Sequence, residues 1–265
     1  DDILDENAHL KAEWKEKLLL YKAPFLNTEY LGFNFNGATS WLQLKEFRQA
    51  INYCYDKEGM IRYLRKGVGS PAISGFIPKG LPPYDEQTLI GYNYDPIKAK
   101  ALLKAIAYDG SEVVLSTNET YKDMALYIAK EAEKVGVKLK VDVVQPSLLR
   151  EWMVNGQVDF FRGSWIADYP DAENYLSLFY SKNGAPPNYT RFNSPTFDLL
   201  YEQSFGIGKV EDRYRLYQQM DSILVEEAPV VFLYYDEIVR ITHANIQHAK
   251  PNALNALDIK YIEKR

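Results

Sequence analysis

The sequence of 265 residues has few of the side chains from which metal sites and disulfides are built. It contains one cysteine, Cys54, which excludes a disulfide framework within the chain and a metal site made of cysteines. Its three histidines are His9, His243 and His248, of which only the last two are close in sequence. Histidines spaced in this way are more often surface residues than metal ligands, so we expect no metal site and no cofactor.

Long apolar runs and concentrated positive charge are also missing. No apolar run approaches the ~20 residues that a membrane-spanning helix needs. The formal net charge is -5, and lysine and arginine are scattered rather than gathered in a stripe, so we expect no nucleic-acid partner. The contents of 46% hydrophobic and 25% charged residues are typical of a globular chain with one large core or two smaller ones.

Motifs for nucleotide binding and for nucleophilic catalysis do not occur. The turn over residues 116–120 reads Ser-Thr-Asn-Glu-Thr, without the glycines that let a backbone approach a pyrophosphate. There is no Walker A sequence, and no nucleophile-elbow sequence that would support a Ser-His-acid triad. These absences argue against a dinucleotide site, an ATP site and a triad enzyme.

The middle of the chain alternates between strand and helix periods. Strand patterns over 112–117, 137–143 and 158–163 are separated by helical patterns over 119–135 and 147–155. This βαβαβ order predicts an α/β fold with parallel strands joined by right-handed crossovers. The other expected elements are a helix over 7–17, strands over 18–21 and 29–36, helices within 44–65, an ordered loop over 67–84, helices that begin at Asp95-Pro96 and Ser194-Pro195, a helix over 211–226, a strand over 230–235 that 238–242 extends, and a tail strand over 258–262.

The last strand of this unit runs into an aromatic and acidic segment, residues 163–176. In an open parallel sheet, ligands bind just past the carboxyl ends of the strands, which places Tyr121 and Trp165 at the same edge. Asp168 follows, between the rings of Trp165 and Tyr169. A buried carboxylate flanked by such rings is a good receptor for an ammonium group, because the charge orients the ligand and the rings add apolar area and cation–π attraction.

Two other interpretations of this segment stay open. Asp171 can be the N-cap of the next helix, with Leu176 and Leu178 facing the core. Alternatively, Asp168 can act with Asp171 or Glu173 as the carboxylate pair of a hydrolase. Carboxylates this close on one loop rarely point at each other, which favours the binding site.

Six ordered segments match a pattern that runs almost from end to end of the chain. They are Thr28–Asn34, Phe47–Tyr53 with Asp56-Lys57, Pro71-Ala72 with Ile77-Pro78, Tyr94-Asp95-Pro96 with 98–103, Trp165–Asp171, and Glu227-Ala228-Pro229 with 232–235. Together they resemble the C-terminal half of bacterial extracellular solute-binding proteins of family 5, the peptide-, dipeptide- and nickel-binding receptors of ABC importers. The order of the segments makes the resemblance specific, since any one of them alone would be weak.

The resemblance implies a periplasmic-binding-protein-like class II fold, in which two lobes joined by crossing strands close on a ligand. Residues 36–230 would form the second, ligand-binding lobe around the βαβαβ core. Residues 1–35 and 231–265 would be partial strands and a helix of the first lobe. Most of that first lobe would precede Asp1, which agrees with a start that has neither Met nor a signal peptide.

The resemblance also implies roles for the residues of the aromatic and acidic segment. The carboxylate of Asp168 would pair with the α-amino group of a bound peptide. The backbone around Ser164 and Ile166 would pair with the peptide as if it were an added strand. Trp165 and Tyr169 would form walls of this half of the site.

Two further residues are assigned to the opposite end of the ligand. Arg162 would contact the ligand carboxylate, or else point to the outer face of its strand, because it alternates with Phe161. Tyr121 stands where some members of the family have a histidine that contacts this carboxylate. That departure leaves the preferred length of the ligand open.

The function implied is that of the substrate-binding component of an ABC importer, which captures oligopeptides or dipeptides and catalyses no reaction. Its partners would be the peptide and the permease subunits in the inner membrane. The protein would be a monomer in the periplasm or cell envelope, with or without a lipid anchor. Alternatives are a receptor of the same family for nickel or another solute, a sensory or docking lobe without transport, and the carboxylate hydrolase described above.

Overall fold

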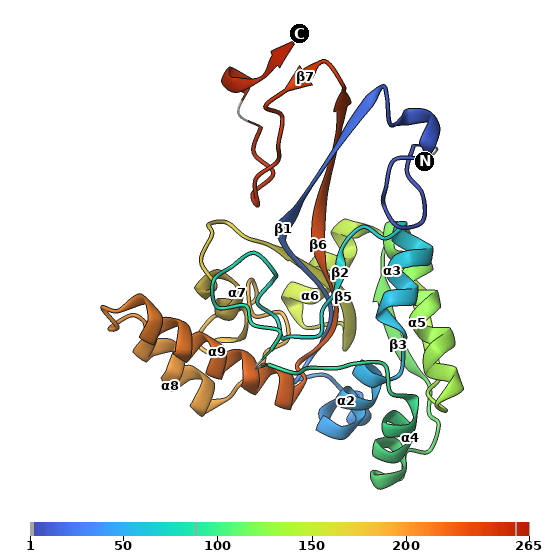
Figure 1. The fold of residues 1–265 in the computed structure, drawn as a ribbon. Coiled ribbons are helices and arrows are strands. Elements are labelled where there is room, and N and C mark those ends of the chain that lie inside the picture. The colour runs from blue at the N-terminus through green and yellow to red at the C-terminus, as the bar shows by residue number, and fades with distance from the viewer. Residues whose placement is uncertain (1–2, 88, 258, 265) are drawn as a thin grey trace.

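The computed structural model describes residues 3–87, 89–257 and 259–264. Among these residues, the main sheet has six strands in the order β2-β6-β1-β5-β3-β4, and β7 pairs with β8 in a second, small sheet (Figure 1). The strands are β1 (Leu18–Phe33), β2 (Ser70–Pro71), β3 (Val113–Thr117), β4 (Leu139–Val143), β5 (Phe160–Ile166), β6 (Val230–His243), β7 (Ile246–Gln247) and β8 (Glu263–Lys264).

The βαβαβ prediction is confirmed. β3 pairs in parallel with β4 and with β5, and the connections are helices α5 (Lys122–Lys134) and α6 (Pro146–Asn155). Gly136 has a φ of 96° just past the end of α5, which is the left-handed conformation expected of a residue that stops a helix. Antiparallel pairing of β5 with β1 then joins this unit to the rest of the sheet.

β1 is one long strand, whereas the sequence pattern predicted two shorter pieces over 18–21 and 29–36, and β6 continues through 238–242 as the predicted extension of the strand over 230–235. They pair antiparallel from Leu18↔His243 to Gly32↔Val230, with register shifts between Pro24 and Thr28 and between Glu29 and Tyr30. Proline interrupts the sequence pattern but is tolerated next to an irregularity in the ladder. In Figure 1 the two strands extend together beyond the helices to the end that carries β7.

The remaining helices are α1 (Ser40–Gln43), α2 (Lys45–Tyr53), α3 (Lys57–Arg65), α4 (Pro96–Ala105), α7 (Glu173–Leu176), α8 (Pro195–Ser204) and α9 (Val210–Glu227), with 3-10 turns η1 (Ala12–Trp14), η2 (Glu119–Tyr121), η3 (Ser177–Phe179) and η4 (Ile259–Tyr261). Two of them, α4 and α8, begin at the predicted signals, because the side chains of Asp95 and Ser194 each accept the backbone N–H of the residue three positions later. Asp56 caps α3 in the same way.

Two predictions near the chain ends are wrong. The helix expected over 7–17 is limited to η1, which contains no buried residue and so has no apolar face to hold a longer helix in place. The tail strand expected over 258–262 is instead the turn η4, and residue 258 lies outside the described residues.

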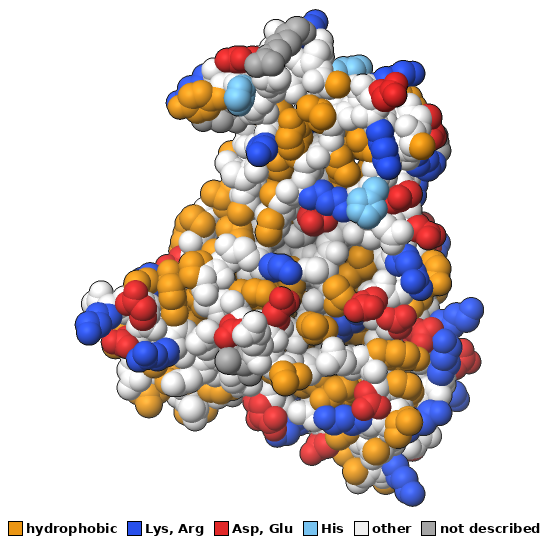
Figure 2. Space-filling view, in the orientation of Figure 1, with side chains coloured by type: hydrophobic (Ala, Val, Ile, Leu, Met, Phe, Trp, Pro, Cys, Tyr) orange, Lys and Arg blue, Asp and Glu red, His pale blue; other side chains and the backbone are white. Residues whose placement is uncertain are grey.

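Each face of the sheet is covered by its own hydrophobic cluster. On β1, Tyr30 belongs to the cluster with α6, α8 and α9, whereas Leu31 belongs to the cluster with α2 to α5. Phe161 and Phe160 alternate in the same way on β5. On the surface drawn in Figure 2, positive and negative side chains are interspersed, and the outline narrows between the helical body and the end near β7.

The loop over 67–84 is ordered, as its apolar residues predicted. Phe76 and Ile77 are fully buried, and their backbone N–H groups donate to the carboxylate of Asp221 on α9 at 2.6 and 3.2 Å. Gly75 has a φ of 96°, and a Cβ atom built there would lie 2.2 Å from Oδ2 of Asp221. The backbone of this loop therefore approaches a buried carboxylate more closely than a side chain would allow.

Asp221 gives the stability a specific pH dependence. Burial raises its pKa to about 7, although the two backbone N–H groups favour the charged form. A carboxyl whose pKa is higher in the folded chain stabilises that state fully below its unfolded pKa, and this stabilisation is lost as pH rises through 7. We expect the free energy of unfolding by urea to fall between about pH 4 and about pH 7, and Asp221→Asn to reduce this decline. An equal decline in the wild-type chain and in Asp221→Asn would show that Asp221 does not cause the pH dependence. Asp123→Asn, on the exposed side of α5, serves as the control.

Candidate functional site

β5 has an open edge near its carboxyl end. On one side, all seven residues of β5 pair with β1. On the other side, β3 pairs with β5 only at Ser116↔Phe161, because β3 ends at Thr117. In the described part of the chain, no strand continues this side past Phe161. The backbone of residues 162–166 is therefore without a strand neighbour there.

The segment that follows β5 is held by a buried amide. Asn174, which is 4% exposed, accepts hydrogen bonds through Oδ1 from Nε1 of Trp165 at 2.8 Å and from the backbone N–H of Asp168 at 3.0 Å. The N–H of Ala167 donates to the carbonyl of Leu26 on β1. These contacts fix the indole of Trp165 and the backbone of Asp168, and the sequence interpretation missed Asn174 because its type is common at helix starts.

The carboxylate of Asp168 is exposed, so the expectation of a buried carboxylate is wrong. Within the described ranges, its side chain makes no hydrogen bond or ion pair. Ile166 and Tyr169 beside it are 54% and 46% exposed. The structure thus gathers apolar surface and an uncompensated negative charge at the open edge of β5.

The other carboxylates of this segment are engaged in the chain's own contacts. Asp171 accepts the N–H of Glu173 at 2.9 Å and pairs with Arg213 at 3.0 Å, while the N-cap position of α7 belongs to Ala172. Glu173 accepts hydrogen bonds from the hydroxyls of Tyr169 and Tyr201. The hydroxyl of Tyr169 therefore points to α7. Leu176 and Leu178 are buried as predicted.

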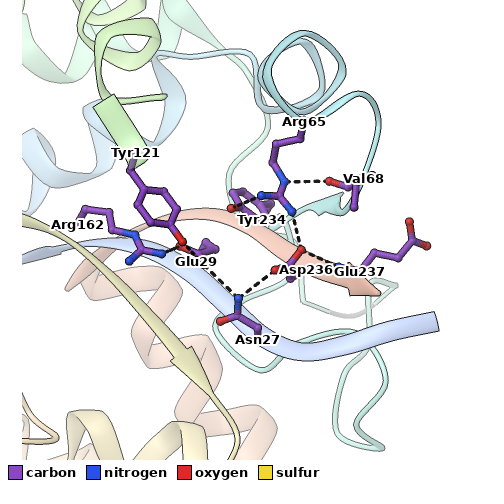
Figure 3. Close-up of polar contacts among 9 residues, drawn as sticks. All are labelled: Asn27, Glu29, Arg65, Val68, Tyr121, Arg162, Tyr234, Asp236 and Glu237. Carbon is purple, nitrogen blue, oxygen red and sulfur yellow. Dashed lines mark hydrogen bonds and ion pairs between the residues drawn. The ribbon is translucent and has the colours of Figure 1, made fainter. Parts of the chain in front are cut away.

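Arg162 belongs to a buried ion pair. Its Nη2 lies 2.5 Å from Oε2 of Glu29 on β1, and the two side chains are 12% and 3% exposed (Figure 3). The guanidinium lies 3.2 Å from the centre of the Tyr121 ring, and the Tyr121 hydroxyl lies 3.5 Å from Oε1 of Glu29. Burial raises the pKa of Glu29, and the Arg162 charge opposes this effect. A ligand carboxylate at Arg162 would have to compete with Glu29.

This pair is one end of a polar network that crosses three strands (Figure 3). Nδ2 of Asn27 donates to Glu29 and to Asp236 on β6, each at 3.1 Å. Arg65 pairs with Asp236 at 2.6 Å and donates to the hydroxyl of Tyr234 at 2.7 Å. The sequence interpretation missed this network, although polar residues at 27 and 29 in an apolar strand were a usable signal, since such residues share one face.

A cavity of about 410 Å³ lies between α6 and the carboxyl end of β5. Three of the predicted site residues, Arg162, Ser164 and Trp165, line it together with residues that the sequence interpretation did not name. Among these are Arg150 and Met153 on α6, and Tyr189. Asp168, Tyr169, Ile166 and Tyr121 lie outside this lining.

A second cavity, of about 480 Å³, lies between Phe35, the start of α8 and the end of α9. It contains none of the predicted site residues and adjoins the end of β1 far from Asn27.

In the described ranges, no three residues among His, Cys, Asp and Glu are grouped so that they could hold a metal ion. Among the same residues, no helix has the length and apolarity needed to cross a membrane.

Comparison with known families gives the decisive match. The model of "Bacterial extracellular solute-binding proteins, family 5 Middle" matches residues 2–187. The chain belongs to family 5 of the bacterial extracellular solute-binding proteins. This membership confirms the resemblance that the six sequence segments predicted.

Individual relatives agree with the family 5 assignment. The chain is 32% identical over 231 residues to Heme-binding protein A of Haemophilus influenzae, which covers 84% of this chain and 41% of that protein. It is 27% identical to the probable D,D-dipeptide-binding periplasmic protein DdpA of Escherichia coli, over 87% of this chain and 45% of that protein. The chain thus spans less than half the length of these relatives.

Solved structures confirm the family 5 fold. HbpA2 from Haemophilus parasuis superposes with a TM-score of 0.86 at 21% identity, over 96% of this chain and 51% of that chain. DppA from Helicobacter pylori, in complex with the peptide STSA, gives a TM-score of 0.81 at 21% identity, over 95% and 50% of the two chains. The sheet and its flanking helices are therefore those of this family.

Proposed function

We propose that this chain is the C-terminal half of the substrate-binding component of an ABC importer, and that the whole protein captures peptides between two lobes. The observation that carries the proposal is the open edge of β5, with the free carboxylate of Asp168 just past its end. A peptide backbone can add to such an edge as a strand, and its terminal ammonium group can pair with the carboxylate. The peptide-binding relatives support this class of solute.

Each predicted residue has a place in this arrangement. The backbone of Ser164 and Ile166 pairs with the ligand, and Asp168 holds its α-amino group. Trp165, whose indole is fixed by Asn174, and Tyr169 provide flanking aromatic surface. Arg162 pairs with Glu29 and packs on the ring of Tyr121, and these contacts hold both side chains below the open edge. Because the guanidinium is already bound to Glu29, direct contact of Arg162 or Tyr121 with the ligand is limited.

The division of the chain follows from the same proposal. Residues 36–230 form the second lobe, and 1–35 and 231–265 return to the first lobe through β1 and β6. The two lobes close on the peptide about these strands, and the loaded protein, a monomer in the periplasm or cell envelope, delivers it to the permease subunits. The protein catalyses no reaction in this scheme.

Replacing Asp168 tests the proposal. In the full-length protein, we expect Asp168→Ala to weaken the binding of a neutral peptide with a free amino terminus by roughly 30-fold, about 2 kcal/mol, because the ammonium group loses its partner in the closed site. Isothermal titration calorimetry measures the change. The N-acetylated peptide should bind the wild-type protein weakly, and Asp168→Ala should leave that affinity unchanged.

The control is Glu133→Ala, which removes an exposed carboxylate from α5 at a distance from β5. Unchanged affinity of Asp168→Ala for the free-amine peptide would rule out the assigned role. Haem is included in the titration because one relative is named a haem-binding protein. Binding of haem without binding of any peptide would show that the solute is haem and not a peptide.

A further inference from the structure

The cavity between α6 and β5 is preformed. Its walls include Met153, Trp165 and Tyr189, which offer apolar and aromatic surface. The hydrogen bond from Trp165 to the buried Asn174 holds the indole in place without a ligand. The cavity adjoins the open stretch of β5 through Ser164, so a group attached to a chain lying along that edge can enter it.

The charges that line this cavity are all positive. Its lining contains Arg150 and Arg162 and no carboxylate. Arg162 is neutralised by Glu29, and its buried Nε has no hydrogen-bond partner among the described residues. Arg150 is exposed on α6, and its side chain makes no ion pair or hydrogen bond with the described residues. The cavity therefore has one uncompensated cation.

Arg150 shares the cavity wall with Tyr189. Burial raises the pKa of Tyr189, and the Arg150 charge opposes this increase. Both side chains line the same cavity, which agrees with this effect. Glu151 is adjacent in sequence, but neighbouring residues on a helix do not face each other.

We propose that this cavity receives a carboxylate group of the bound peptide, and that Arg150 is the side chain that selects it. The inference rests on the proposed function and adds a preference for acidic ligands to it. The guanidinium of Arg150 can form a charge-assisted hydrogen bond with a carboxylate, whereas that of Arg162 is already bound to Glu29. The carboxylate can belong to an acidic side chain or to the carboxyl terminus of a short peptide.

Three peptides with the same free amino terminus and the same length distinguish these sources. One is neutral and amidated, one is amidated with a glutamate side chain, and one is neutral with a free carboxyl terminus. In the full-length wild-type protein, we expect at least one carboxylate peptide to bind about tenfold more tightly than the neutral amidated peptide. Whichever carboxylate peptide binds more tightly than the neutral amidated peptide identifies the source of the carboxylate.

Arg150→Gln should remove this tenfold difference and leave the affinity for the neutral amidated peptide within about twofold. Arg150→Lys should retain part of the difference, because it keeps the charge without the planar guanidinium. Lys130→Gln, which removes an exposed cation from α5 away from the cavity, should change neither affinity. The difference in the wild-type protein should also shrink as the salt concentration rises.

The outcomes separate this inference from the proposed function. If the wild-type protein binds all three peptides equally, or if Arg150→Gln keeps the difference, the role of Arg150 is wrong while peptide capture stands. If the protein binds none of the peptides, peptide capture fails and the preference for acidic ligands fails with it.

Discussion

Replacing Glu29 with alanine is expected to lower the free energy of unfolding by about 3–5 kcal/mol. Glu29 is 3% exposed and is the ion-pair partner of Arg162, whose side chain is 12% exposed. Its removal leaves a buried guanidinium with no compensating charge and also removes an acceptor for Asn27. Breaking a buried pair costs more than the pair itself contributes, because the remaining charge stays out of water. Urea denaturation of the wild-type and variant chains measures the difference.

Two further variants show whether the unpaired charge is the cause. Arg162→Met in the Glu29→Ala background removes the stranded guanidinium and should recover more than half of the lost stability. Glu202→Ala breaks the Lys182–Glu202 pair, whose side chains are 45% to 67% exposed, and should cost no more than about 1 kcal/mol. A loss at Glu29 as small as the loss at Glu202 would show that the pair does not bear on folding.

Gly75→Ala is expected to destabilise the chain by about 3 kcal/mol or more, through two additive costs. The positive φ at this position is unfavourable for a residue with a Cβ atom. The added methyl group would also overlap the carboxylate of Asp221, which is held by the N–H groups of Phe76 and Ile77. The loop would have to give up these hydrogen bonds to make room. Thermal and urea unfolding both report the loss.

Two other glycines separate the two costs. Gly110 has a φ of 79° with no atom within 4 Å of a built Cβ, so Gly110→Ala should show the cost of the backbone conformation alone, about 1 kcal/mol. Gly184 has neither a positive φ nor a close neighbour, so Gly184→Ala should change stability by less than about 0.5 kcal/mol. If Gly75→Ala lowered the free energy of unfolding by no more than Gly110→Ala, the close approach of Gly75 to Asp221 would not contribute to stability.

Features that depend on neighbours in sequence could be predicted. The N-caps Asp56, Asp95 and Ser194 act on residues three positions later, and the βαβαβ unit follows from local periods. The continuity of β1 could not be read in this way, because Pro24 interrupts the pattern while the partner strand β6 keeps the pairing across the irregularity. The length of β1 depends on its pairing with β6, which lies about 200 residues further along the chain.

The candidate site shows the same limit. The loop after β5 and its aromatic residues could be located from sequence, since topology predicts the ligand-bearing edge. The contact between Arg162 and Glu29 joins residues 133 positions apart, and no local pattern records it. The exposure of Asp168 was also beyond sequence reasoning, because burial depends on what packs around a loop rather than on its residue types.

The open edge of β5 has a consequence for how the chain behaves when its ligand is absent. Unpaired N–H and C=O groups along a strand accept any extended segment, including the same strand of another molecule, and this is a common route to aggregation. Here the exposed stretch covers only residues 162–166, with the exposed Arg150 beside it and the exposed Asp168 just past its end. The short edge opposes self-association, whereas these opposite charges can attract one another between copies, so the self-association of the empty protein is expected to decrease as the salt concentration rises.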